Sequence, residues 1–206
     1  TPLQPAFSSA QYWEERYQKR GTSGAGSYGN LAEFKAGVVN SFIKNNKIET
    51  LGDFGFGDGN QAAMLKVKNY NGFEISENAI VLCTEKFNGR KGYTFQHVDQ
   101  LQGQKFDLCL SMDVIFHLVE DAIFEIYMHR LFNASQQWVM IYSSNGDKLP
   151  GNHSAHMLDR HFTACVEKQV PGFELVEKIE NRYPYNPAQP TTTSISDFYI
   201  YKKKTT

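Results

Sequence analysis

Long hydrophobic runs are missing from this chain of 206 residues. No apolar stretch approaches the roughly 20 residues that a membrane-spanning helix requires, so we expect a soluble protein with no membrane partner. An excess of one charge is missing too, because 21 basic and 22 acidic side chains nearly cancel. Without a strong electrostatic field the chain is not expected to bind nucleic acid, and a small or neutral substrate fits this balance better.

Cysteine is scarce, with three residues that lie far apart and form no C-x-x-C pair. This spacing argues against a disulfide framework and favours free thiols in a reducing compartment, so we expect a cytoplasmic location. A secretory signal is also absent from the first residues. Because the chain begins with Thr rather than Met, we expect it to be excised from a longer protein.

The length allows a single α/β domain with a sizeable core. Residues 46–206 are expected to form this core, and residues 1–45 an N-terminal arm and a lid helix. The arm covers the polar, glycine-rich residues 1–29 and lies outside the core, and its loop at 21–29 has the composition of a mobile lid. Apolar residues recur at helical spacing over 30–44, which predicts the lid helix.

Strands and helices are expected to alternate through the core. The expected strands are 48–54, 72–75, 93–98, 106–111 and 138–142, and the expected helices are 61–67, 77–87, 122–132 and 158–168. Such alternation is typical of a parallel sheet with helices on both faces and ligands at the carboxyl ends of the strands. Two final strands, 173–179 and 196–202, flank a proline-rich loop and predict an antiparallel hairpin at the edge of the sheet.

A glycine-rich turn, Asp53-Phe-Gly55-Phe-Gly57-Asp-Gly59, follows the first strand. Glycine permits a positive φ and lets a ligand touch the backbone, although such a turn also occurs without any ligand. A dinucleotide-binding turn would need glycine at the position of Asn60. This departure disfavours a nicotinamide cofactor.

Carboxylates stand at the ends of the first three strands: Asp53, Glu74 and Asp99. In this order they can meet an ammonium group, ribose hydroxyls and an adenine amino group, while Ile75 and Val98 enclose the adenine ring. Each acid taken singly is equally explained as a strand-end or helix-capping residue. Together with the glycines they favour an adenosine-containing ligand that carries an amino group.

Four segments resemble the successive motifs of class I methyltransferases over residues 48–142. They are Asp53-x-Gly-x-Gly-x-Gly59, Gly72-Phe-Glu-Ile-Ser76, Val98-Asp99 and Phe106-Asp-Leu-Cys-Leu-Ser-Met-Asp-Val-Ile-Phe-His117. The resemblance implies a Rossmann-like sheet of seven mostly parallel strands with an antiparallel C-terminal hairpin strand. It also implies S-adenosylmethionine as the cofactor and S-adenosylhomocysteine as the product.

The resemblance assigns cofactor-binding roles to individual residues. The methionine part falls on Asp53, Gly55 and Gly57, the ribose on Glu74, and the adenine on Ile75 and Asp99, and Ser111 joins the same set. One departure is Phe56, which is bulkier than the small residue that is frequent there and is expected to alter packing around the methionine part. Tyr28 and Lys35 are expected to cover the cofactor and pair with its carboxylate, the alternative being a solvated lysine.

The flanks suggest a subgroup. Residues 12–17, 24–35 and 156–163 resemble methyltransferases found beside glycosyltransferases in polysaccharide synthesis, including methyltransferase domains of multidomain chlorovirus glycan-synthesis proteins. This resemblance implies a sugar hydroxyl in a glycan as the acceptor and covalently linked glycosyltransferase domains as partners. For a viral protein, the location would be the host cytoplasm.

Methyl transfer to a hydroxyl requires removal of a proton, so a base is expected near the fourth strand. His117 is the first candidate, because a neutral imidazole accepts a proton at physiological pH. If the segment after the strand is helical, Asp113 shares a face with His117 and either orients it or binds an acceptor hydroxyl. A packed structural histidine is the alternative.

The segment after the fifth strand supplies further candidates. His153, His156 and Arg160 are expected to border the acceptor pocket and bind hydroxyls, or else to lie on a helix surface. The two histidines without a third ligand make a poor metal site, so no metal is expected.

Three other functions stay open. One is an N- or O-methyltransferase of the natural-product type, in which proximity alone suffices. The others are a nicotinamide-dependent oxidoreductase, which Asn60 disfavours, and a binding module without catalysis.

Overall fold

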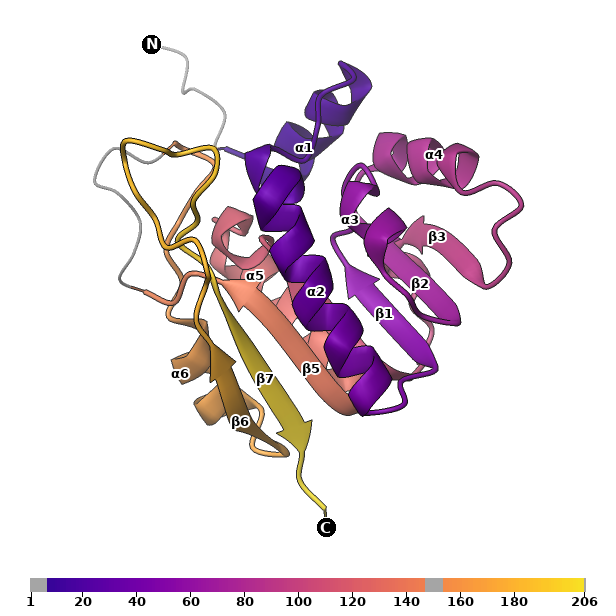
Figure 1. Cartoon of the computed structure of the whole chain (residues 1–206), viewed down its shortest axis with the longest axis vertical. Helices are drawn as coiled ribbons and strands as arrows, with labels where there is room; N and C mark the ends of the chain where they lie inside the picture. Colours follow the sequence, from indigo (N-terminus) through magenta and orange to yellow (C-terminus); the bar gives the residue numbers. More distant parts are fainter. Residues whose placement is uncertain (1–6, 147–153, 206) are drawn as a thin grey trace.

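A single seven-stranded sheet forms the centre of the protein (Figure 1). The structure is a computed structural model, and it describes residues 7–146 and 154–205. The strand order is β3-β2-β1-β4-β5-β7-β6. The strands are β1 (Thr50–Phe54), β2 (Asn69–Glu74), β3 (Tyr93–His97), β4 (Phe106–Met112), β5 (Ser135–Ser143), β6 (Phe173–Ile179) and β7 (Asp197–Lys203). The first five are parallel, and β7 runs antiparallel between β5 and β6. The predicted fold class is confirmed.

Helices cover both faces of this sheet. One face carries α2 (Gly29–Asn45), α3 (Asn60–Met64) and α4 (Glu77–Lys86), and the other carries α5 (Asp121–Asn133) and α6 (Phe162–Gln169). Short 3-10 turns are η1 (Ala25–Ser27), η2 (Val98–Gln100) and η3 (Ile115–His117). Within the described part of the chain, none of these helices has the length and apolar character needed to cross a bilayer.

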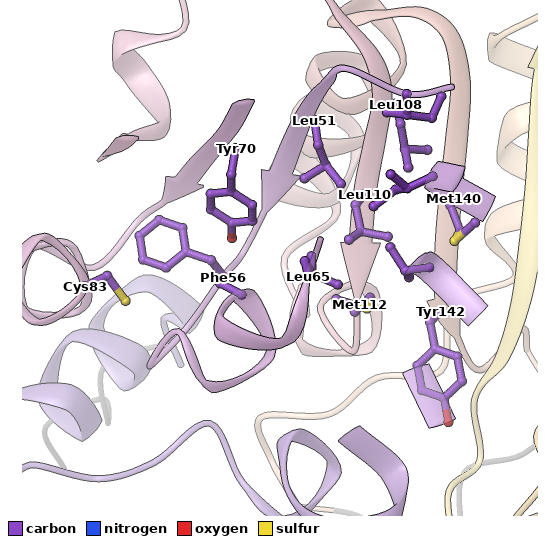
Figure 2. Close-up of a cluster of buried hydrophobic side chains, with 14 of the residues drawn as sticks. Leu51, Phe56, Leu65, Tyr70, Cys83, Leu108, Leu110, Met112, Met140 and Tyr142 are labelled. Carbon is purple, nitrogen blue, oxygen red and sulfur yellow. The ribbon is translucent and has the colours of Figure 1, made fainter. Parts of the chain in front are cut away.

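The central strands are apolar along nearly their whole length because both of their sides are covered. Six of the seven residues of β4 are buried. Figure 2 shows how Leu108, Leu110 and Met140 of β4 and β5 pack beside Leu51 of β1 on the face covered by α2. A strand with two buried faces lacks the alternation of polar and apolar residues, as expected for a parallel sheet.

The chain changes direction across the sheet between β1 and β4. It proceeds outward from β1 to β3, then returns to add β4 and β5 on the other side of β1. The loops that leave neighbouring β1 and β4 therefore diverge toward opposite faces, and a crevice forms between them. A Cβ at Gly55, in the first loop, would lie only 2.5 Å from Cγ2 of Val114 in the second. Glycine is thus required where the two loops meet.

The expectation that residues 1–29 lie outside the core is wrong for their helical part. The helix α1 (Ser9–Gln18) lies at the carboxyl ends of the parallel strands (Figure 1), and Tyr17 is buried in the core. Glu14 fixes α1 to the start of α4, since its carboxylate accepts hydrogen bonds from Ser76 Oγ and Asn78 Nδ2, each at 2.5 Å. A short helix that packs against loops carries little periodic signal, so the sequence pattern did not reveal this contact.

Two predicted helices are shorter than expected. The chain leaves α3 after Met64 because Asn40 bonds the Met64 carbonyl oxygen and the Lys66 amide, at 2.9 and 2.8 Å. The helix α6 starts at Phe162 instead of residue 158. The residues before it are held against the loop after β4, because the Leu158 amide donates a hydrogen bond to the Phe116 carbonyl oxygen at 2.8 Å. Both boundaries are set by contacts with residues distant in sequence.

Candidate active site

A cavity of about 370 Å³ lies at the carboxyl ends of the strands, where the loops after β1 and β4 diverge. This volume falls within the usual range for small-molecule sites. Its walls come from α1, from the loop at 23–27 and from the ends of the first four strands, with α5 closing one side. A groove of about 770 Å³ between α2 and the β6–β7 hairpin is larger, but none of the predicted site residues lines it.

One end of the cavity carries the predicted ribose and adenine residues. Glu74, Ile75 and Asp99 all line it. The Glu74 carboxylate accepts the Gly57 amide at 3.1 Å and the Ile75 amide at 2.7 Å, and its burial raises its pKa. The Asp99 carboxylate is exposed and pairs with Arg130 at 2.8 Å. An apolar surface flanked by two carboxylates suits an adenosine group.

Asp53 does not lie on the cavity wall. Its carboxylate is buried and accepts a hydrogen bond from the Tyr70 hydroxyl at 2.6 Å. Burial, with a contribution from the Glu74 charge, raises the pKa of Asp53 to about 7. The predicted direct contact with an ammonium group is therefore not provided by this conformation, because the carboxylate faces the core beneath the glycine turn.

Two other residues of this region also point into the core. The Ser111 hydroxyl is fully buried and accepts from the Tyr127 hydroxyl at 2.7 Å, so Tyr127, not Ser111, reaches the cavity. Phe56 packs against Phe95 with ring centroids 5.0 Å apart, and Figure 2 shows its ring beside Tyr70. The bulky Phe56 thus fills the core, and the expectation that it disturbs the methionine end is wrong.

The loop at 21–28 contributes to the cavity wall and is fastened to the glycine turn by Asp58. The Asp58 carboxylate accepts from the Ser23 amide at 2.8 Å and from the Tyr28 hydroxyl at 2.7 Å, and the Asp58 amide donates to Ser23 Oγ at 2.9 Å. Tyr28 is thus used to hold the loop closed. Ser23 and Ser27 line the cavity, which fits the predicted position of a lid.

His117 lies on the cavity wall at the end of η3. Its Nδ1 is 3.0 Å from the carbonyl oxygen of His156, and the Trp13 ring contacts it edge-on with centroids 5.0 Å apart. A carbonyl oxygen can only accept, so Nδ1 carries the proton and Nε2 keeps its lone pair. Burial lowers the pKa of His117 to about 4, so the ring is neutral at neutral pH. The side chain is a neutral, oriented proton acceptor.

The predicted helical pairing of Asp113 with His117 is wrong. Asp113 has a φ of 56°, which breaks any helix at that point, and only Ile115–His117 form a helical turn. Asp113 is among the residues that line the cavity, and its carboxylate accepts from Ser196 Oγ at 2.9 Å and pairs with Lys35 at 2.7 Å. The orienting partner of His117 is instead a backbone carbonyl.

Lys35 is fully buried, so the alternative of a solvated lysine is wrong. Its ammonium group lies between the Asp113 carboxylate and the Tyr142 ring, 5.3 Å from the ring centroid. The predicted pairing with a cofactor carboxylate is not provided here, because Asp113 takes that place. A buried cation paired in this way links α2 to the end of β4.

The segment after β5 contributes differently from expectation. His153 lies outside the described residues. His156 precedes α6 and stacks between Tyr12 and His117, with ring centroids 4.5 and 5.3 Å away. Arg160 is absent from the cavity wall, because its guanidinium binds protein carbonyls and Asp121. Among residues 7–146 and 154–205, no three acidic, histidine or cysteine side chains gather to hold a metal ion.

Several residues that line the cavity were not predicted from the sequence. Trp13 and Tyr17 come from α1, which lies within the predicted N-terminal arm. Ile123, Ile126 and Arg130 come from the exposed side of α5. Their spacing of i, i+3 and i+7 places them on one helix face. Two isoleucines on a helix face that otherwise meets solvent were the only hint in the sequence that this face lines a cavity.

Comparison with known proteins bears on the fold and on the cofactor. Residues 52–132 match the model of a methyltransferase domain family. This chain has the class I methyltransferase fold. The matched family depends on S-adenosylmethionine, which confirms the predicted cofactor and disfavours the nicotinamide alternative. No curated protein sequence matches the chain.

Solved methyltransferase structures superpose over most of the chain. The magnesium protoporphyrin IX methyltransferase ChlM from Synechocystis has a TM-score of 0.68 at 13% identity, with 95% of this chain and 98% of that one covered. The N-methyltransferase NodS from Bradyrhizobium japonicum gives 0.68 at 10%, with 96% and 99% covered. The methyltransferase domain of a bacterial CtHen1 gives 0.66 at 15%, with 85% and 100% covered. At such identities the likeness shows the fold alone, so the chemistry of this chain has to be argued from its own site.

Replacing Asp58 by alanine should open the loop at 21–28. The variant loses three hydrogen bonds to a carboxylate, each worth about 1.5–3 kcal/mol: those from the Ser23 amide and the Tyr28 hydroxyl, which hold the loop, and that from the Asn60 amide. We expect the dissociation constant for S-adenosylhomocysteine, measured by calorimetry, to rise about tenfold or more. Glu33→Ala removes an exposed carboxylate of α2 and serves as the control. If the Asp58→Ala variant bound S-adenosylhomocysteine as tightly as the native protein, the bonds of Asp58 would not be what holds this loop at the cavity wall.

Proposed function

We propose that this methyltransferase transfers the methyl group of S-adenosylmethionine to a hydroxyl group of a sugar in a glycan, with His117 as the general base. The observation that carries the proposal is the state of His117: it lines the cavity, is neutral, and has its Nδ1 bonded to a backbone carbonyl. Nε2 is thereby left as the proton acceptor. An oriented acceptor of this kind is needed for a hydroxyl and is superfluous for an amine that is already unprotonated.

The residues of the cavity fit the cofactor. Glu74 and Asp99 offer carboxylate oxygens at one end, and the apolar side chains of Ile75 and Val98 lie beside them. Ser23, from the loop at 21–28, and Gly55, from the glycine turn, also line the cavity. When bound, the cofactor supplies a methyl group on a positively charged sulfur, which keeps the electron pair of the broken carbon–sulfur bond.

The chain's own groups then hold the acceptor and take its proton. Nε2 of His117 receives the proton as the acceptor oxygen forms its bond to the methyl carbon. That oxygen becomes strongly acidic as the bond forms, so a base with a pKa of about 4 is sufficient, and burial keeps it unprotonated. Asp113 has lone pairs left beside its bonds to Lys35 and Ser196, and these can accept from a neighbouring hydroxyl of the acceptor.

A sugar is proposed as the acceptor on two grounds. Trp13 and Tyr17 line the cavity, with Trp13 beside His117, and an aromatic wall next to polar groups suits the mixed apolar and hydroxylated faces of a pyranose. The flanking segments, including residues 12–17, resemble methyltransferases of polysaccharide synthesis. On the same ground we propose that glycosyltransferase domains on the same polypeptide deliver the glycan.

Isotope-labelled S-adenosylmethionine and a panel of acceptors test this function. We expect label in a methyl ether of a rhamnose- or hexose-terminated oligosaccharide, detected by mass spectrometry. The rate should be level at neutral and alkaline pH and fall as the pH drops toward the pKa of His117, about 4, because protonation removes the base. Label found only on amine acceptors would refute hydroxyl transfer. Cofactor binding without transfer to any acceptor would favour a non-catalytic module.

A further inference from the structure

One arginine side chain ties the segment at 154–160 to the loop that carries His117. Arg160 Nε and Nη2 donate to the Leu118 carbonyl oxygen at 3.0 and 2.8 Å, and Nη2 also donates to the Val119 carbonyl oxygen at 2.9 Å. Nη1 donates to Asp121 at 2.5 Å. All three nitrogens of the guanidinium are therefore engaged with protein, which explains why Arg160 does not take part in the cavity wall.

The same segment bonds the loop at two further points. The His156 carbonyl oxygen is bonded by His117 Nδ1 at 3.0 Å, and the Leu158 amide donates to the Phe116 carbonyl oxygen at 2.8 Å. Alternate residues 156, 158 and 160 thus contact three successive residues, 116–118. The contact made by Arg160 is the strongest of the three, because its guanidinium group is charged and presents several N–H donors in one plane.

We propose that Arg160 is a positioning residue that selects the tautomer of His117. By clamping residues 156–160 against residues 116–119, it keeps the His156 carbonyl oxygen on Nδ1, so the proton stays there and the lone pair stays on Nε2. The consequence for catalysis rests on the proposed function of His117, whereas the tautomer itself does not. Arg160 acts entirely through His156, since no substrate contact is involved.

This role requires the planar guanidinium group of an arginine, with its several N–H donors. The carbonyl oxygens of Leu118 and Val119 precede α5 and lie outside its hydrogen-bond ladder. One guanidinium can bond both oxygens while its plane lies over the Phe124 ring, with the guanidinium carbon 4.8 Å from the ring centroid. An ammonium group has neither the fork nor the plane. Lysine at this position is therefore expected to keep the charge and lose the clamp.

The tautomer can be read from the ring nitrogen shifts of His117, assigned by comparison with the His117→Gln variant, in the whole labelled protein. In the native protein we expect a protonated Nδ1 and an unprotonated Nε2. In both Arg160→Gln and Arg160→Lys we expect protonation to shift toward Nε2 and kcat to fall about tenfold. The dissociation constant for S-adenosylhomocysteine should stay within about twofold, because Arg160 does not line the cavity.

Asp121→Asn is the matched control. It removes the ion pair of Arg160 with an 86% exposed carboxylate but leaves the bonds to both carbonyls, so we expect the native tautomer and near-native kcat. A native tautomer in the folded Arg160 variants would overturn the proposal. So would an Nε2-protonated His117 in the native protein, a measurement that does not depend on any variant folding. A shifted tautomer with unchanged kcat would support the clamp and count against His117 as the base.

Discussion

Replacing His117 by glutamine is expected to lower kcat by about a hundredfold to ten-thousandfold, the usual contribution of a general base. Glutamine is of similar size, and its amide group can still donate to the His156 carbonyl oxygen in place of Nδ1. The wall of the cavity is thus retained while the basic nitrogen is lost. The measurement is turnover at saturating S-adenosylmethionine with the acceptor that the labelling experiment identifies.

The dissociation constant for S-adenosylhomocysteine serves as the internal reference for this variant and should stay within about threefold. His129→Gln, the same change at an exposed position of α5, should leave kcat unaltered. A His117→Gln variant that turns over at the native rate would show that proximity of the acceptor suffices. The site would then be better suited to an amine or to an acceptor that is already ionised.

Replacing Lys35 by methionine is expected to reduce the free energy of unfolding by about 3 kcal/mol or more, as for other broken buried ion pairs. Lys35 is 1% exposed and its partner Asp113 is 19% exposed, so the remaining carboxylate keeps little contact with water. Asp113 is also held at a φ of 56°, a conformation that non-glycine residues adopt only when their surroundings fix it. Losing the cation removes one of those fixing contacts.

Urea denaturation measures this effect, and the double variant Lys35→Met/Asp113→Asn separates its cause. The neutral amide no longer leaves a buried charge unpaired, so we expect the double variant to regain part of the lost stability. Lys44→Met, on the exposed side of the same helix α2, should change stability by less than about 0.5 kcal/mol. Native stability of Lys35→Met would show that water or another group replaces the cation.

The parts of the site that local sequence predicted are those built by one strand and the turn that follows it. Glu74, Ile75 and Asp99 line the cavity as expected, because the carboxyl ends of neighbouring parallel strands meet at one edge of the sheet. Asp53 occupies the same kind of position. Its carboxylate is nevertheless buried, and the Tyr70 hydroxyl of the neighbouring strand donates a hydrogen bond to it at 2.6 Å.

The parts that the sequence did not predict depend on contacts between distant segments. Lys35 and Asp113 are 78 residues apart, and His117 and the carbonyl that orients it are 39 apart. A periodic pattern describes which face of one element is apolar, but it does not tell which loop supplies a hydrogen-bond partner. The position of α1 over the cavity is of the same kind, since it is set by Glu14 reaching the start of α4.

The sequence alone determined the doubly covered sheet, the antiparallel final hairpin and the place of Glu74, Ile75 and Asp99 on the cavity wall, because alternation and strand-end acids are local properties. Only the tertiary structure decided how the residues around Asp113 and His117 are arranged. There a left-handed residue at Asp113 replaces a helix, a buried Lys35 neutralises it, and the backbone of His156 sets the proton on His117. These features arise where β4, α2 and the segment before α6 converge, and no single stretch of sequence contains them.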